Sequence, residues 1–227
     1  MTSNKGVFIT LEGGDGTGKS TQIRLLADTL SAAGVNVVTT REPGGTPQAE
    51  RIRNMLLQRD SGTFDPLTEA MLMFSARREH LVNKIWPAMD AGQWVISDRF
   101  ADSTRAFQGF GMGLDMGLIE KLYTLVAGDF HPDLTLIFDI EPEAGLARSM
   151  KHMSQTANIA ESTEDRYERM GLAFHSRLRE GFLKIAHDNP ARCVVIDAAD
   201  DILTVHRKVV AVITERFGLS LQEAKHG

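Results

Sequence analysis

The chain has 227 residues, of which 42% are hydrophobic, and a length near this value favours one domain over two. Its formal net charge of -5 argues against a surface that grips a nucleic acid polymer. The N-terminus has no signal-peptide core, no apolar run reaches the ~18 residues of a membrane span, and the single cysteine, Cys193, cannot form an internal disulfide, so we expect a cytoplasmic protein.

Five short apolar runs, each rich in Val, Ile, Leu or Phe and followed by polar residues, predict buried parallel strands at residues 6–13, 36–42, 94–100, 134–140 and 192–198. Helical patterns lie between and after them, at residues 19–34, 46–60, 66–92, 116–130 and 201–218. The alternation predicts an α/β fold whose parallel sheet is covered by helices on both faces. Ligands of such a sheet bind at the carboxyl ends of its strands.

Residues 151–166 interrupt this alternation because they are polar and have no apolar period. We expect the next helix to begin near Ser162. Loops longer than about 12 residues in compact domains are often lids, so we interpret the segment as a mobile flap. An ordinary surface loop is the alternative.

The stretch GGDGTGKS follows the first predicted strand and precedes the first predicted helix. It matches G-x-x-x-x-G-K-S/T, a loop whose backbone N–H groups hold phosphates at a helix N-terminus. Lys19 would reach the β- and γ-phosphates of a nucleotide, and the Ser20 hydroxyl would bind Mg²⁺. The predicted phosphate-binding residues are Gly13, Gly14, Asp15, Gly16, Thr17, Gly18, Lys19, Ser20 and Thr21.

Two further polar features point to a second substrate. Asp15 would repel a polyphosphate unless it faced a hydroxyl, a metal or a cation, so it could bind a second substrate's sugar. The stretch SDRF ends the third predicted strand, where Asp98 could join the Mg²⁺ shell and Arg99 could bind a phosphate through two hydrogen bonds. A structural ion pair between these two residues is the alternative. An anionic acceptor needs mainly positioning and charge neutralisation.

From Gly6 to about Ile185 the chain resembles bacterial thymidylate kinase, a P-loop nucleoside-monophosphate kinase, in the ordered set LEGGDGTGKST, TREPGGT, SARREHL, SDRFADSTRAFQG and EDRYER. The resemblance implies a P-loop NTPase fold with a five-stranded parallel sheet, formed by residues 1–227 as one kinase domain. It also implies transfer of the γ-phosphoryl of ATP to dTMP with Mg²⁺, giving dTDP and ADP for dTTP synthesis. Family members are usually homodimers.

The resemblance also implies roles for individual residues. Asp15 would bond the 3′-hydroxyl of dTMP, and Arg53 and Arg99 would bind its 5′-phosphate. Thr104 and Gln108 would contact the base. Phe107 would crowd the 2′ position of the sugar and exclude a ribose, although core packing is the alternative for this ring.

The thymine-contacting arginine has two possible registers. Arg77 matches the arginine that reads a thymine oxygen, but the residue four positions earlier is Met73, where the family usually has phenylalanine. Phe74 with Arg78 has the same spacing on a helix. The sequence therefore leaves the register open by one residue, and Phe74 has the same core-packing alternative as Phe107.

Some family members place a catalytic basic residue in the P-loop and others place arginines in the lid. The variable P-loop positions, 14–17, hold no basic residue, so the chain resembles the lid-arginine type. Within the lid, residues 148–166, the candidates are Arg148 and Arg166, with Lys151 between them. We expect a neutral substitution at either arginine to lower kcat far more than it raises the KM for ATP.

Two other functions remain open at this level. The same scaffold could phosphorylate another small acceptor, and dTMP, dUMP, AMP, CMP and shikimate assayed side by side would separate these. A nucleotide-dependent switch is the second alternative, although the sequence has no N-K-x-D guanine signature and more cations facing an acceptor than a switch needs.

Overall fold

The computed structural model describes residues 6–57, 64–156, 167 and 169–221, with the side chains of residues 152–156 excepted. Its sheet has five parallel strands in the order β2-β3-β1-β4-β5. They are β1 (Phe8–Gly13), β2 (Val37–Arg41), β3 (Trp94–Asp98), β4 (Leu134–Asp139) and β5 (Cys193–Asp197). The predicted five-stranded parallel sheet is thus confirmed.

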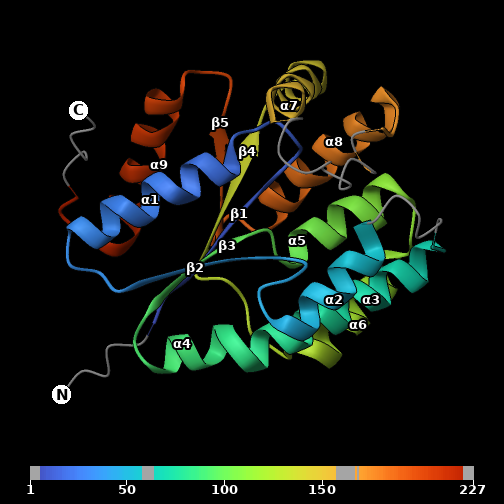
Figure 1. The fold of residues 1–227 in the computed structure, drawn as a ribbon, viewed down its shortest axis with the longest axis horizontal. Helices are drawn as coiled ribbons and strands as arrows, with labels where there is room; N and C mark the ends of the chain where they lie inside the picture. The colour runs from blue at the N-terminus through green and yellow to red at the C-terminus, as the bar shows by residue number, and fades with distance from the viewer. Residues whose placement is uncertain (1–5, 58–63, 157–166, 168, 222–227) are drawn as a thin grey trace.

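The helices of the described residues follow the strands in alternation (Figure 1). They are α1 (Lys19–Ala32), α2 (Pro47–Leu57), α3 (Pro66–His80), α4 (Trp86–Asp90), α5 (Ala101–Thr104), α6 (Met116–Ala127), α7 (Pro142–Thr156), α8 (Leu172–Asp188) and α9 (Ile202–Phe217), with π-helical segments η2 (Leu81–Ile85) and η3 (Arg105–Gly111). The long predicted helix at 66–92 is the run α3, η2 and α4. Its start is fixed because the Asp65 side chain accepts the N–H groups of Leu67 and Thr68.

Helices cover both faces of the sheet, as the apolar strand runs require. Ile9 and Leu11 of β1 pack with α1 and α9, whereas Phe8 of the same strand packs with α3, α4 and α6 on the other face. Ile137 of β4 packs against α8. Successive side chains of a strand point to opposite faces, so a strand buried on both sides must be apolar throughout. Among the described residues, no helix is both long and apolar enough to cross a membrane.

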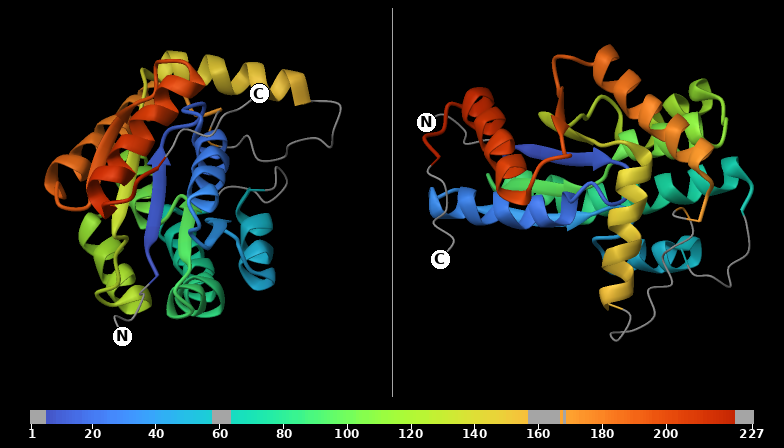
Figure 2. Two further views of the ribbon diagram at one scale, coloured as in Figure 1. Left: turned by 90° about the vertical axis from the view of Figure 1, so that its left-hand side faces the viewer. Right: turned by 90° about the horizontal axis from the view of Figure 1, so that it is seen from above.

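The carboxyl ends of the central strands bring two predicted motifs together. Leu11 of β1 pairs with Asp98 of β3, so the loop after β1 and the residues after β3 begin side by side. Both views in Figure 2 show α7 crossing this edge of the sheet. Its first turn touches the phosphate loop, because a Cβ on Gly145 would lie 2.8 Å from the carbonyl oxygen of Asp15 and a Cβ on Gly16 would overlap the carbonyl of Gly145.

The prediction of a loop from residue 151 onward is wrong for residues 151–156, which form the end of α7. This helix projects from the sheet (Figure 2), so its last turns need no apolar face and give no periodic signal. Residues 157–166 of the predicted lid lie outside the described residues. Ser162, where we expect the next helix to begin, also lies outside the described residues. Tyr167 and residues 169–171 are not helical, and α8 begins at Leu172.

Candidate functional site

A cavity of about 990 Å³ opens at the carboxyl edge of the sheet. The phosphate loop forms one wall, and the ends of β2 and β3 with α2, α3, α5 and η3 form another. Arg148 of α7 and the start of α9 complete it. Binding sites for small molecules measure about 300–1,000 Å³, so this cavity has room for more than one small ligand.

The phosphate loop has the shape that its glycines predict. Gly13, Gly16 and Gly18 have φ angles of 131°, 72° and 86°, a region that favours glycine. Lys19 Nζ donates to the carbonyl of Gly14 at 2.6 Å and to that of Gly13 at 3.1 Å. Residues 15–21 line the cavity, whereas Gly13 and Gly14 are not among its lining residues and hold Lys19 through their carbonyls. The loop carbonyls therefore accept from the Lys19 ammonium group and hold it in place.

Lys19 lies in a desolvated position among mixed charges. Burial and the nearby Arg99 guanidinium lower its pKa to about 8, against the opposing effect of Asp98, Asp15 and Glu12. Phosphate oxygens would favour the charged form and raise this pKa again. Phosphate binding is therefore linked to the protonation of Lys19.

Ser20 and Asp98 meet at the floor of the loop. Ser20 Oγ donates to Asp98 Oδ2 at 3.0 Å, so the two predicted metal ligands are neighbours. In the part of the chain that the structure describes, no group of three or more His, Cys, Asp or Glu side chains could hold a metal. Mg²⁺ characteristically takes one or two protein oxygens together with substrate phosphates and water. The hydroxyl and the carboxylate fit such an ion.

Arg99 joins the phosphate loop to the residues after β3. Its guanidinium donates to the Gly13 carbonyl at 2.8 Å, to Asp15 Oδ1 at 2.8 Å and to Ser103 Oγ at 3.1 Å. It also lies 4.9 Å from the ring centroid of Phe107. Arg99 has a φ angle of 68°, and backbone strain of this kind clusters at functional sites.

A buried carboxylate, Glu12, supports this arrangement. It accepts the backbone N–H of Phe100 at 2.7 Å and the Ser103 hydroxyl at 2.5 Å. Burial, followed by the charge of Asp102, raises the pKa of Glu12 to about 8. Glu12 therefore fixes both the residue after Arg99 and a hydroxyl that Arg99 contacts.

The structure places the two candidate arginines of α3 differently. Met73 and Arg77 line the cavity, whereas Phe74 is buried beneath Arg77, its ring centroid 4.7 Å from the guanidinium carbon. Arg78 is exposed and donates to the carbonyl of Val126 at 2.8 Å. Phe74 and Arg78 are not among the residues that line the cavity, because adjacent helix positions point about 100° apart, and the thymine contact of Arg77 stays a prediction.

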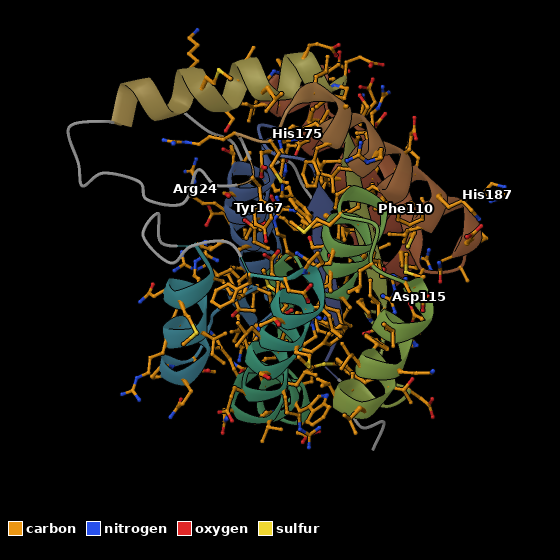
Figure 3. All side chains as sticks on the ribbon, turned by 90° about the vertical axis from the view of Figure 1, so that its right-hand side faces the viewer. Arg24, Phe110, Asp115, Tyr167, His175 and His187 are labelled. Carbon is orange, nitrogen blue, oxygen red and sulfur yellow. The ribbon has the colours of Figure 1, made fainter. Side chains whose placement is uncertain are left out.

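The remaining predicted acceptor residues, Thr104, Phe107, Gln108 and Arg53, all line the cavity. Arg53 Nη1 donates to the carbonyl of Pro43 at 2.7 Å. Gln108 Nε2 donates to Glu69 Oε1 at 2.7 Å, and the Tyr167 hydroxyl donates to the same oxygen at 2.6 Å. Figure 3 draws Tyr167 between α7 above and α2 and α3 below.

Arg148 lies on a different wall from these residues. Its guanidinium donates to the carbonyls of Ala198 at 2.7 Å and Ala199 at 2.6 Å, in the turn between β5 and α9. Ile202 and Leu203, which also line the cavity, expose 57% and 51% of their surface. Arg166 lies outside the described residues, so its role stays a prediction.

Three carboxylates that support the site were not identified from the sequence, namely Glu12, Glu42 and Glu69. All three are buried. The usable signal is an acidic residue inside an otherwise apolar strand or helix, since a buried carboxylate requires charged or hydrogen-bonding partners. Glu12 closes the run VFITLE in this way.

Comparison with known proteins gives one result throughout. The family model described as Thymidylate kinase matches residues 11–209. The chain is 47% identical over 215 residues to a thymidylate kinase of Caulobacter vibrioides, covering 95% of this chain and 99% of that protein. It is 48% identical over 215 residues to a thymidylate kinase of Pseudomonas fluorescens, covering 95% and 98% of the two chains.

A solved structure agrees with these relatives. The crystal structure of thymidylate kinase from Ehrlichia chaffeensis superposes with a TM-score of 0.73 at 41% identity, covering 92% of this chain and 99% of that one. The family model begins within β1 and extends through the phosphate loop and the other four strands. The chain therefore belongs to the thymidylate kinase family, the nucleoside-monophosphate kinases that phosphorylate dTMP with ATP.

Proposed function

We propose that this chain transfers the γ-phosphoryl of ATP directly to the 5′-phosphate of dTMP, giving dTDP and ADP without a covalent enzyme intermediate. The observation that carries the proposal is a single cavity with the phosphate loop on one wall and Arg53, Arg77 and Arg99 on the other. Phosphoryl transfer needs mainly positioning and charge neutralisation, and these walls supply both.

The donor is held by the phosphate loop. Backbone N–H groups of residues 15–21 and Lys19 would bind the β- and γ-phosphates at the N-terminus of α1. The exposed apolar surface of Ile202 and Leu203, beside Arg148, suits the flat base of the nucleotide. The alternative role of Arg148, at the transferring phosphoryl, stays a prediction.

The acceptor is held by arginines from three separate elements. Arg53 comes from α2, Arg77 from α3, and Arg99 follows β3. Arg53 and Arg99 would bind the 5′-phosphate, Asp15 would accept the 3′-hydroxyl, and Arg77 would meet the base. In this scheme dTMP would break the ion pair between Asp15 and Arg99. Asp15 would then accept a hydrogen bond from the sugar, and Arg99 would contact the charged phosphate.

Mg²⁺ would be held by Ser20 and Asp98 together with phosphate oxygens of ATP. When bound, it would neutralise charge on the donor phosphates. The chain's own contribution is to keep the hydroxyl and the carboxylate side by side and to exclude water that would hydrolyse ATP.

We also propose a homodimer in the cytoplasm. Exposed apolar side chains gather on α3, η2 and α6, where α3 and α6 pack together, namely Met71, Val82, Leu118 and Leu125. A second copy of the chain would cover this face. Sedimentation of wild type against Leu125→Glu would test it, because an unchanged monomeric mass for both excludes the dimer.

The decisive experiment is a coupled ADP-release assay with dTMP, dUMP, dCMP, AMP and shikimate as acceptors. We expect kcat/KM to be highest for dTMP and Lys19→Ala to abolish the signal. Equal low ADP release with and without every acceptor would refute the kinase and favour a slow hydrolase.

A further inference from the structure

A chain of hydrogen-bonded polar side chains, all buried except the half-buried Thr40, leads from β2 to Arg77. Thr40 Oγ1 lies 2.6 Å from His80 Nε2, and His80 Nδ1 lies 2.9 Å from Glu42 Oε1. The other oxygen of Glu42 accepts Arg77 Nε at 2.7 Å, and Arg77 Nη2 donates to Thr104 Oγ1 at 3.1 Å. His80 and Glu42 are both buried, so water does not compete for these contacts.

These contacts fix the tautomer and the orientation of the His80 ring. A carboxylate oxygen only accepts, so His80 Nδ1 must carry the hydrogen that it donates to Glu42. Nε2 can then accept the hydroxyl of Thr40. The ring is also packed closely, because a Cβ on Gly45 would lie 2.5 Å from Nε2. His80 is therefore held in one orientation and holds Glu42 in turn.

Arg77 keeps one unused donor in this arrangement. Its Nη1 is buried, and no acceptor among the described residues forms a hydrogen bond with it. Phe74 and Phe100 lie against the guanidinium, 4.7 and 5.0 Å from its central carbon, and fix its plane. An unsatisfied buried donor is costly unless a ligand supplies the acceptor, and Arg77 lines the cavity.

We propose that His80 and Glu42 are positioning residues that set the choice of pyrimidine by fixing Nη1 of Arg77. The proposal rests on the function proposed above, in which Arg77 meets the base. A guanidinium only donates, so a fixed Nη1 favours a base edge with a carbonyl and disfavours one with an amino group. Thymine and cytosine differ in this way at position 4. An Arg77 released from Glu42 would turn away from an amino group at little cost, and discrimination would fall.

The test compares dTMP and dCMP as ligands of wild type, His80→Leu, His80→Asn and Glu42→Gln. The readout is the ratio of their dissociation constants, measured by calorimetry without ATP, so it does not depend on turnover. We expect His80→Leu and Glu42→Gln to lower this preference for dTMP about tenfold or more, as expected for loss of a hydrogen bond to a charged group. His80→Asn keeps an N–H near the Nδ1 position, and we expect it to retain most of the preference.

Val209→Ala is the matched control, because it removes buried apolar volume from the core of α9 on the opposite face of the sheet. It should lower the thermal midpoint and leave the ratio unchanged. A folded His80→Leu or Glu42→Gln protein in which both ligands weaken equally would overturn the proposal. Failure of wild type to phosphorylate dTMP in the ADP assay would instead refute the proposed function, a separate outcome from a changed or unchanged binding ratio.

Discussion

The two walls of the cavity are built from different parts of the chain. The donor wall is one continuous stretch, residues 15–21, whose binding groups are mainly backbone atoms and one lysine. The acceptor wall consists of side chains from α2, α3, η3 and the residues after β3, held by hydrogen bonds such as Arg77 to Glu42 and Gln108 to Glu69. A backbone cradle recognises any polyphosphate, whereas the side-chain wall can be specific for one acceptor.

This difference predicts how each wall responds to substitution. Damage to the donor wall should affect every acceptor alike. Damage to the acceptor wall should change KM and selectivity while leaving ATP binding intact. The following substitutions test that division.

The largest effect is expected for Lys19→Ala. Lys19 is the buried cation of the donor wall, and removing a preorganised cation at a transferring phosphoryl costs on the order of 10³-fold or more in rate. Steady-state kcat with dTMP and with dUMP should fall by similar factors. A loss below tenfold for a folded variant would show that the loop amides suffice.

Arg99→Met should lower kcat/KM for dTMP by about 10²-fold, since it removes a bidentate phosphate contact. Arg99 also donates to the Gly13 carbonyl and to Asp15 of the phosphate loop, so the dissociation constant for ATP should rise too, but by about tenfold or less. Arg78→Met is the matched control, as Arg78 faces away from the cavity. Equal weakening of ATP and dTMP would break the division between the walls.

Arg148→Met tests whether Arg148 binds ATP or acts at the transferring phosphoryl. We expect a change of about tenfold in either KM or kcat, the typical value for one charged hydrogen bond. Contacts between Arg148 and the Ala198 and Ala199 carbonyls favour a higher KM for ATP with little change in kcat. The sequence-based hypothesis expects the opposite split. Initial rates at varied ATP and saturating dTMP decide between them.

The smallest effect is a pH linkage at Lys19. Its pKa is lowered to about 8 by burial and by Arg99, so Lys19 carries less than one full proton at pH 8–9, and bound ATP should restore that proton. Affinity for ATP should therefore fall as pH rises through 8. Calorimetry in buffers of different ionisation enthalpy measures the uptake.

Two variants assign that proton. Lys19→Arg keeps a permanent charge and should remove most of the uptake. Glu12→Gln removes the other group with a pKa of about 8 and should leave most of it. Uptake that disappears only in Glu12→Gln would place the proton on the carboxylate.

The sequence predicts the donor wall better than the acceptor wall for a physical reason. Lys19 and Ser20 lie in one contiguous motif between a strand and a helix, and that local context determines the geometry. Arg77 could be assigned only with the fold in hand, because Met73 and Phe74 leave two registers and only burial separates them. Arg77 and His80 lie 35 and 38 positions along the chain from Glu42, the partner that they share. No local sequence pattern indicates contacts over such distances.

The contact between Gly145 and the phosphate loop has a mechanical consequence. Main chain meets main chain there, with Gly145 and Gly16 both unable to carry a side chain. If a nucleotide displaced the loop, the backbone of α7 would have to move with it, because no side chain lies between the two segments that could change rotamer instead. Both glycines should be intolerant in a mutational scan, and for Gly145 this intolerance would arise without a place in the lining of the cavity.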